Sequence, residues 1–280
     1  MLIVTGTKRS GTSMWMQILT SAGFPAFGEA FPRNWGDTIK DANPDGFYES
    51  ILRQGIYYRT NPHPQTGAYF FPEQVERHVV KVFIPGLVRT DRAYIGSVVA
   101  TVRHWREYHD SLERLYAMED EARQENKGVD VRPPRIPPVY EWWSENYSLI
   151  RDIVTRKFRV HVQSYDGLLS NPKKVIENTL EWLGDDEVDV EAAVAAVKPK
   201  NRTQKRDDGA EAPEGLSDAA VEAFELLYRT IDERSGLTPA LINQLNTVHV
   251  ELAPKIAAAQ KAVSEARAKR RKRPKAEASR

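Results

Sequence analysis

The sequence contains no cysteine, and this absence excludes several kinds of chemistry. Without thiols the chain forms neither disulfides nor thiolate nucleophiles, and it cannot hold zinc or an iron–sulfur cluster through cysteine. Long hydrophobic runs are also lacking, because no stretch approaches the ~20 apolar residues that span a bilayer. Residues 1–4 lack the basic start and long apolar stretch of a signal peptide, so we expect a cytoplasmic location.

An excess of charge of one sign is missing as well, since the formal net charge of the 280 residues is only +1. The charges are nevertheless unevenly placed. Residues 266–280 carry eight Lys or Arg and one Glu, while the rest of the chain has 32 basic and 38 acidic residues. Such a basic end can meet nucleic acid or an anionic membrane, but a disordered, solubilising tail is the commoner explanation. We therefore expect a basic, disordered tail and no nucleic-acid partner.

Short apolar, β-branched runs alternate with helical patterns through most of the chain, which predicts an α/β fold. Strands are expected at 2–5, 79–84, 97–102 and 158–162, and helices at 12–22, 104–119, 140–157, 172–183 and 188–197. Residues 121–138 are polar and contain proline, which predicts a loop or flap. Near-continuous Val, Ile and Ala runs are typical of parallel strands covered on both faces. Right-handed βαβ crossovers between them would form a three-layer α/β/α fold with a central parallel sheet.

The last part of the sequence is helical without strands. Helical patterns cover 217–234 and 239–268, so a domain boundary is expected near 206–215. The predicted organisation is an α/β domain at 1–208, a helical extension at 209–265 and the basic tail at 266–280. An apolar stripe on the last helix either packs on the domain or pairs with a second copy, which leaves a homodimer open; it comprises Leu252, Ile256, Ala259 and Val263.

Residues 6–13, Gly-Thr-Lys-Arg-Ser-Gly-Thr-Ser, place two glycines five positions apart between a predicted strand and a predicted helix. Glycine lets the backbone turn its amides inward, and the start of a helix adds positive potential, so such a loop binds a tetrahedral anion. A nucleoside triphosphatase has lysine directly after the second glycine, but Thr12 stands there. Such enzymes also end a later strand in Asp to hold Mg²⁺, whereas Arg103 follows the strand at 97–102. The sequence therefore predicts a P-loop-like anion site without a divalent metal.

The loop also resembles a known family. Arg9-Ser10-Gly11-Thr12-Ser13 is similar to the loop that binds the 5′-phosphosulfate in sulfotransferases using 3′-phosphoadenosine 5′-phosphosulfate (PAPS). Arg103 and Ser111, eight positions apart, are similar to the family's 3′-phosphate-binding pair. The guanidinium of Arg103 offers two parallel donors for a phosphate, and Ser111 adds a hydroxyl from about two helical turns further on.

Two more segments fit this family. Residues 164–169, Ser-Tyr-Asp-Gly-Leu-Leu, resemble a segment that implies a place near the adenine for Tyr165. Residues 43–49, Asn-Pro-Asp-Gly-Phe-Tyr-Glu, resemble a motif of many bacterial sulfotransferase-like sequences. The resemblance covers residues 1–205 and does not account for the helical C-terminus.

The resemblance implies an enzyme that transfers the sulfonate of PAPS in line to a hydroxyl or amine of an acceptor. Adenosine 3′,5′-bisphosphate would be released, and no metal would be needed. Arg9, Lys81 and the loop amides would stabilise the charge that grows on the bridging oxygen. Phe83 stands where cytosolic members have the catalytic histidine, and phenylalanine cannot accept a proton. No residue pattern identifies the acceptor.

Another side chain must therefore act as the general base. Glu49 is the first hypothesis, because some branches of the family use a glutamate and the 43–49 motif follows the first predicted helix. A glutamate in this role would need partial burial to raise its pKa. Glu29 is the second. Further options are His78, His104 and His109.

A late basic loop matches, by position and charge, the family loop that closes over the 3′-phosphate, and Lys200 and Arg202 are its candidate contacts. Aromatic residues at Trp35, 57–58 and 69–71 either line an acceptor pocket or pack in the core. Two other functions stay open. One is a P-loop nucleotide or nucleoside kinase that lacks the usual lysine, and the other is a non-catalytic nucleotide-binding protein, which Phe83 favours.

Overall fold

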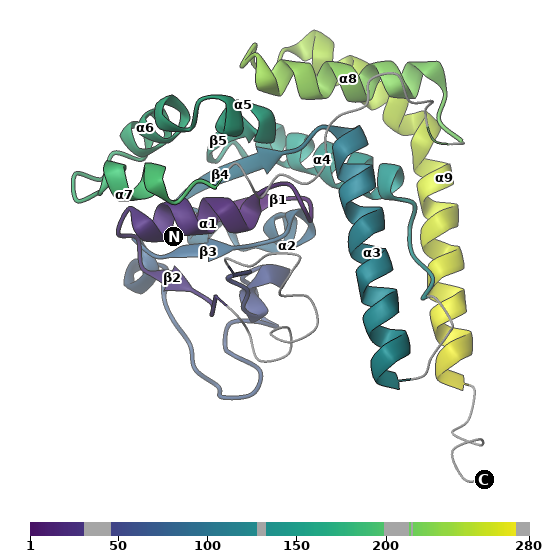
Figure 1. Cartoon of the computed structure of the whole chain (residues 1–280), viewed down its shortest axis with the longest axis horizontal. Coiled ribbons are helices and arrows are strands. Elements are labelled where there is room, and N and C mark those ends of the chain that lie inside the picture. Colours follow the sequence, from purple (N-terminus) through teal and green to yellow (C-terminus); the bar gives the residue numbers. More distant parts are fainter. Residues whose placement is uncertain (31–45, 128–132, 199–212, 214, 273–280) are drawn as a thin grey trace.

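The computed structural model describes residues 1–30, 46–127, 133–198, 213 and 215–272 (Figure 1). Its centre is a five-stranded sheet with the strand order β2-β3-β1-β4-β5, in which every neighbouring pair is parallel. The strands are β1 (Leu2–Gly6), β2 (Ala26–Phe27), β3 (Val79–Lys81), β4 (Ser97–Val102) and β5 (Arg159–Ser164). Because β3 and β4 lie on opposite sides of β1, the chain reverses its direction of travel across the sheet at β1.

Helices surround this sheet in the part of the chain that the structure describes. They are α1 (Thr12–Ser21), α2 (Ile84–Arg89), α3 (Trp105–Lys127), α4 (Pro138–Arg156), α5 (Tyr165–Ser170), α6 (Pro172–Leu183), α7 (Val190–Ala195), α8 (Asp218–Asp232) and α9 (Pro239–Lys272). Short 3-10 helices occur at η2 (Ile51–Gln54), η3 (Pro72–Val75) and η4 (Arg92–Tyr94). Figure 1 shows α1, α5, α6 and α7 on one face of the sheet.

The central strand β1 is buried on both faces, as a parallel sheet between two helical layers requires. Successive side chains of a strand point to opposite faces. Leu2 and Val4 accordingly pack in one apolar cluster with Trp15 of α1, while Ile3 packs in another with Leu149 of α4. The predicted three-layer α/β/α fold with a central parallel sheet is confirmed.

The C-terminal helices α8 and α9 share an apolar cluster with α3 and α4. Phe224 of α8 is fully buried at the centre of this cluster. Its ring centroid lies 4.9 Å from that of Trp143, 5.1 Å from that of Trp142 and 5.8 Å from that of Trp105. Since these tryptophans belong to helices next to the sheet, the helical C-terminus is attached through large aromatic contacts.

Several element boundaries differ from those predicted. The strand expected at 79–84 ends at Lys81, and α2 begins at Ile84, because Pro85 favours the first turn of a helix and cannot donate in the interior of a sheet. The helix expected to end at 119 continues to Lys127, because residues 120–127 include no glycine or proline. Helix α9 likewise runs to Lys272, through the start of the tail that was expected to be disordered, since Ala, Lys and Arg are strong helix formers.

The aromatic cluster around Phe224 predicts that α8 contributes to the stability of the whole fold. Phe224→Ala should lower the free energy of unfolding by about 3–5 kcal/mol, because it leaves a cavity among the tryptophan rings. Urea denaturation followed by tryptophan fluorescence measures this loss. Val250→Ala, at a position of α9 that is 75% exposed, is the matched control and should change stability by less than about 0.5 kcal/mol. Equal effects of the two substitutions would contradict the shared core.

Candidate active site

The loop between β1 and α1 turns sharply at Arg9 and Gly11, which have φ values of 64° and 97°. The positive φ of Gly11 favours glycine. A side chain is also excluded there because a Cβ atom would lie 2.8 Å from the ring of Tyr165. Gly11 is also the N-cap of α1, so the next amides, those of Thr12 and Ser13, have no acceptor within the helix. These amides and the positive end of the helix dipole form a site for an anion.

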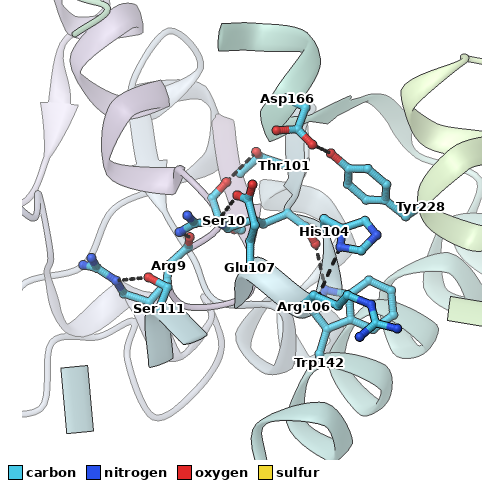
Figure 2. A network of polar contacts seen from close by, with 11 residues as sticks. Arg9, Ser10, Thr101, His104, Arg106, Glu107, Ser111, Trp142, Asp166 and Tyr228 are labelled. Carbon is cyan, nitrogen blue, oxygen red and sulfur yellow. Dashed lines mark hydrogen bonds and ion pairs between the residues drawn. The ribbon is translucent and has the colours of Figure 1, made fainter. Parts of the chain in front are cut away.

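Ser10 and Thr101 fix the shape of this loop from inside. The Ser10 hydroxyl donates to the carbonyl of Thr7 at 2.7 Å. The Thr101 hydroxyl donates to the carbonyl of Ser10 at 2.8 Å (Figure 2). The side chain of Ser10 is fully buried by these contacts. It therefore holds the loop rather than facing the cavity.

The loop meets the end of β4 and the start of α3 through two arginines. Arg9 Nε donates to the hydroxyl of Ser111 at 3.1 Å (Figure 2), and Arg103 Nη1 donates to the carbonyl of Arg9 at 3.1 Å. Arg103 also forms an ion pair with Glu107 at 3.1 Å, and its guanidinium carbon lies 4.8 Å from the centre of the Tyr165 ring. Residues from three distant segments, the loop after β1, the stretch 103–111 and the start of α5, thus converge at the carboxyl edge of β1 and β4. In open α/β sheets this point, where the strand order reverses, is where ligands bind.

Like charges are brought close together here. Burial lowers the pKa of Arg9, and the charge of Arg103 lowers it further. A guanidinium that is both desolvated and next to another cation is stabilised by a bound anion. The positive charge of the two arginines and the free amides of the loop therefore both favour a bound anion.

A second polar cluster surrounds Lys81 at the end of β3. Lys81 Nζ lies 3.1 Å from Glu49 Oε1, 3.1 Å from the hydroxyl of Ser13 and 2.7 Å from the carbonyl of Phe47. The other carboxylate oxygen of Glu49 accepts from Arg53 Nη1 at 2.5 Å. Lys81 is 97% buried, and this burial lowers its pKa. The cluster holds one ammonium group beside the first turn of α1.

A cavity of about 1110 Å³ joins the two clusters. Most of the residues that the sequence predicted for the site line it, namely Arg9, Gly11, Thr12, Ser13, Glu49, Lys81, Arg103, Ser111 and Tyr165. Phe83 lines it as well. Among the described residues, no group of three or more His, Asp or Glu is placed to hold a metal ion.

Sequence reasoning missed one wall of this cavity. Lys8 Nζ lies 2.9 Å from Glu141 Oε1 of α4, and Glu145, one helical turn further on, also lines the cavity. The hydroxyl of Tyr116 on α3 donates to Glu141 at 3.4 Å. Burial, followed by the charge of Glu141, raises the pKa of Glu145 to about 8. The only signal in the sequence was a pair of glutamates four apart on a predicted helix, which is common on exposed helices.

The other candidate bases lie away from the cavity in the described structure. His104 is buried, with Nε2 at 3.0 Å from Glu225 Oε2, and His109 lies beside Asp110. His78 packs against the ring of Phe27. Glu29 forms a backbone bridge with Glu49, and its side chain is not part of the cavity wall.

Several predicted contacts lie outside the described residues. They are Trp35, residues 43–45 of the 43–49 motif, Lys200 and Arg202. The aromatic residues at 57–58 and 69–71 are described, and they are absent from the cavity lining. Within the same ranges, none of the helices has the length and apolar content needed to cross a bilayer.

No family model and no curated protein matches the sequence. Two solved structures similar to this chain are a sulfotransferase from Mycobacterium tuberculosis and the sulfotransferase domain of an olefin synthase from Synechococcus. The first has 14% sequence identity and a TM-score of 0.43, with 81% of this chain and 75% of that chain covered. The second has 16% identity and a TM-score of 0.39, with 89% and 94% covered.

Proposed function

We propose that this chain is a sulfotransferase that moves the sulfonate of PAPS to a hydroxyl or amine of an acceptor. One observation carries the proposal: Arg9, Arg103 and Ser111 meet at a loop whose helix-starting amides are open to an anion. Thr12 occupies the position where a triphosphatase needs lysine, and Arg103 the position where it needs a magnesium-binding Asp. The site therefore suits a nucleotide that binds without a divalent metal.

The residues at the site fit the parts of PAPS. The amides of Thr12 and Ser13, with Arg9, would hold the 5′-phosphosulfate, while Arg103 and Ser111 would hold the 3′-phosphate. The adenine would lie near Tyr165, which also lines the cavity. Lys200 and Arg202 are proposed as additional contacts to the 3′-phosphate.

When bound, PAPS supplies the sulfonate that is transferred. The protein contributes fixed positive charge, since Arg9 and Lys81 line the same cavity and cannot move away from the charge that develops. Glu49 has both carboxylate oxygens engaged, one by Lys81 and the other by Arg53. We therefore assign Glu49 the role of positioning Lys81.

Two alternatives are distinguished by what the site binds. A kinase should bind Mg·ATP, but Arg103 at the end of β4 would repel the metal. A non-catalytic protein should bind the nucleotide without transferring sulfonate. Measuring the transfer of ³⁵S-labelled sulfonate from PAPS to a library of hydroxyl compounds separates this alternative from the enzyme.

Adenosine 3′,5′-bisphosphate should stabilise the protein in the presence of EDTA. At a concentration of about 100 times Kd, the stabilisation is about 2.7 kcal/mol, which raises Tm by about 5 °C. Differential scanning fluorimetry measures the shift, with Mg·ATP as the comparison. Arg103→Gln should weaken binding about 10- to 100-fold through the loss of charged hydrogen bonds, whereas Arg106→Gln, outside the cavity, should not. A shift with Mg·ATP alone would contradict the proposal.

Lys81→Met should reduce sulfonate transfer by about 10²–10³-fold, because it removes a fixed charge beside the reacting group. The Tm shift with adenosine 3′,5′-bisphosphate should remain, since Lys81 is not assigned to either phosphate of this product. Lys173→Met, at a side chain that is 75% exposed on α6, is the control and should leave transfer unchanged. Transfer at the wild-type rate in Lys81→Met would remove Lys81 from the mechanism.

A further inference from the structure

Four carboxylates line the cavity in the described part of the chain, and three of them already have cationic partners. Glu49 pairs with two cations, Glu119 lies 3.2 Å from Arg135, and Glu141 lies 2.9 Å from Lys8. Glu145 is the exception. It makes no hydrogen bond or ion pair with any described residue, although it is partly buried and lines the same cavity. A buried carboxylate without a partner costs free energy, so its presence at this wall requires an explanation.

The position of Glu145 brings it close to the anion loop. Residues four apart on a helix are neighbours on its surface, so Glu145 lies next to Glu141, which contacts Lys8. Lys8 directly precedes Arg9 in the loop. Glu145 is thus one helical turn from the carboxylate that pairs with the residue next to Arg9.

A tyrosine lies behind this wall. The side chain of Tyr108 on α3 is fully buried. Burial raises the pKa of Tyr108, and the charges of Glu141 and Glu145 raise it further, which places the hydroxyl within electrostatic reach of both carboxylates. Tyr108 is fully buried and is not part of the cavity wall, so an acceptor hydroxyl in the cavity would meet Glu145.

Two charged groups act on Glu145. Glu141 lies on the same helix, and Lys8 lies on the loop after β1. Arg267 of α9 lines the same cavity. Burial is the largest influence and raises the pKa of Glu145, Glu141 raises it further, and Lys8 lowers it, with a result of about 8. A base is most effective when its pKa lies near the working pH.

We infer that Glu145 is the general base that takes the proton from the acceptor hydroxyl, in place of the histidine that Phe83 replaces. This inference rests on the proposed sulfotransferase function. In the step, the acceptor O–H proton moves to a carboxylate oxygen of Glu145 while the acceptor oxygen forms a bond to sulfur. The bond between sulfur and the 5′-phosphate oxygen breaks, and its electron pair leaves with adenosine 3′,5′-bisphosphate. No other reactant is needed.

The test uses water as the acceptor, so it does not depend on the natural one. Release of ³⁵S-labelled sulfate from PAPS is measured from pH 5.5 to 9.5 in the wild type, Glu145→Gln and Glu141→Gln. The wild-type rate should rise with pH to a half-maximum near pH 8, because the base must be ionised. Glu145→Gln should lower the rate about 10²–10⁴-fold. The remaining rate should no longer depend on pH in this way. Glu141→Gln should move the midpoint to lower pH, because it removes the negative charge beside Glu145.

Two measurements of Tm, which do not depend on catalysis, complement the rate measurements. The Tm shift with adenosine 3′,5′-bisphosphate should be the same in Glu145→Gln and the wild type. Folding raises the pKa of this carboxyl from about 4.3 in the unfolded chain to about 8. The folded protein therefore loses stability as the pH rises between these two values. Glu145→Gln should therefore have a higher Tm than the wild type at pH 9, and the difference should disappear at pH 4 and below.

Three results would overturn the inference. The first is a Glu145→Gln variant with the wild-type rate and pH profile. The second is a midpoint that does not move in Glu141→Gln. The third is a wild type that binds adenosine 3′,5′-bisphosphate but releases no sulfate at any pH. A wild type that does not bind the bisphosphate would instead remove the proposed function itself.

Discussion

The site depends on two arginines, the buried Arg103 and the half-buried Arg9, that are held together where the sheet reverses its strand order. Arg103 donates to the backbone of Arg9, and Arg9 donates to Ser111, so the loop after β1 is tied to both β4 and α3. Like charges repel, and the protein offsets this with Glu107, which pairs with Arg103 at 3.1 Å. Trp142 of α4 fixes the same point from another side, since its Nε1 donates to the carbonyl of Arg103 at 2.9 Å. A bound anion would complete this balance of charge.

The same tryptophan links the site to the helical C-terminus. Trp142 packs against Phe224 of α8, so the residues that position Arg103 belong to the largest aromatic cluster in the described structure. His104, directly after Arg103, contacts Glu225 of the same helix at 3.0 Å. The end of β4 is therefore supported from the sheet, from α4 and from α8. This support explains how two neighbouring cations are held in fixed positions.

The position of the loop after β1 beside Arg103 could be predicted from the sequence because its signals are local. The glycine spacing at 6–11 requires a tight turn between a strand and a helix, and parallel strands bring their carboxyl ends to one edge, which places Arg103 near that turn. The wall with Glu141 and Glu145 could not be predicted, because helical periodicity shows which residues share a face but not which element that face meets. The short strand β2 and the short helix α5 were missed for a related reason, since two to six residues give too little periodicity to recognise.

A crystal structure with adenosine 3′,5′-bisphosphate, grown in EDTA, tests the central claim most directly. The account predicts the 5′-phosphate within hydrogen-bonding distance of the amides of Thr12 and Ser13, and the 3′-phosphate within reach of Arg103 and Ser111. A nucleotide bound elsewhere, or loop amides that point away from it, would contradict the account and leave only the α/β fold established.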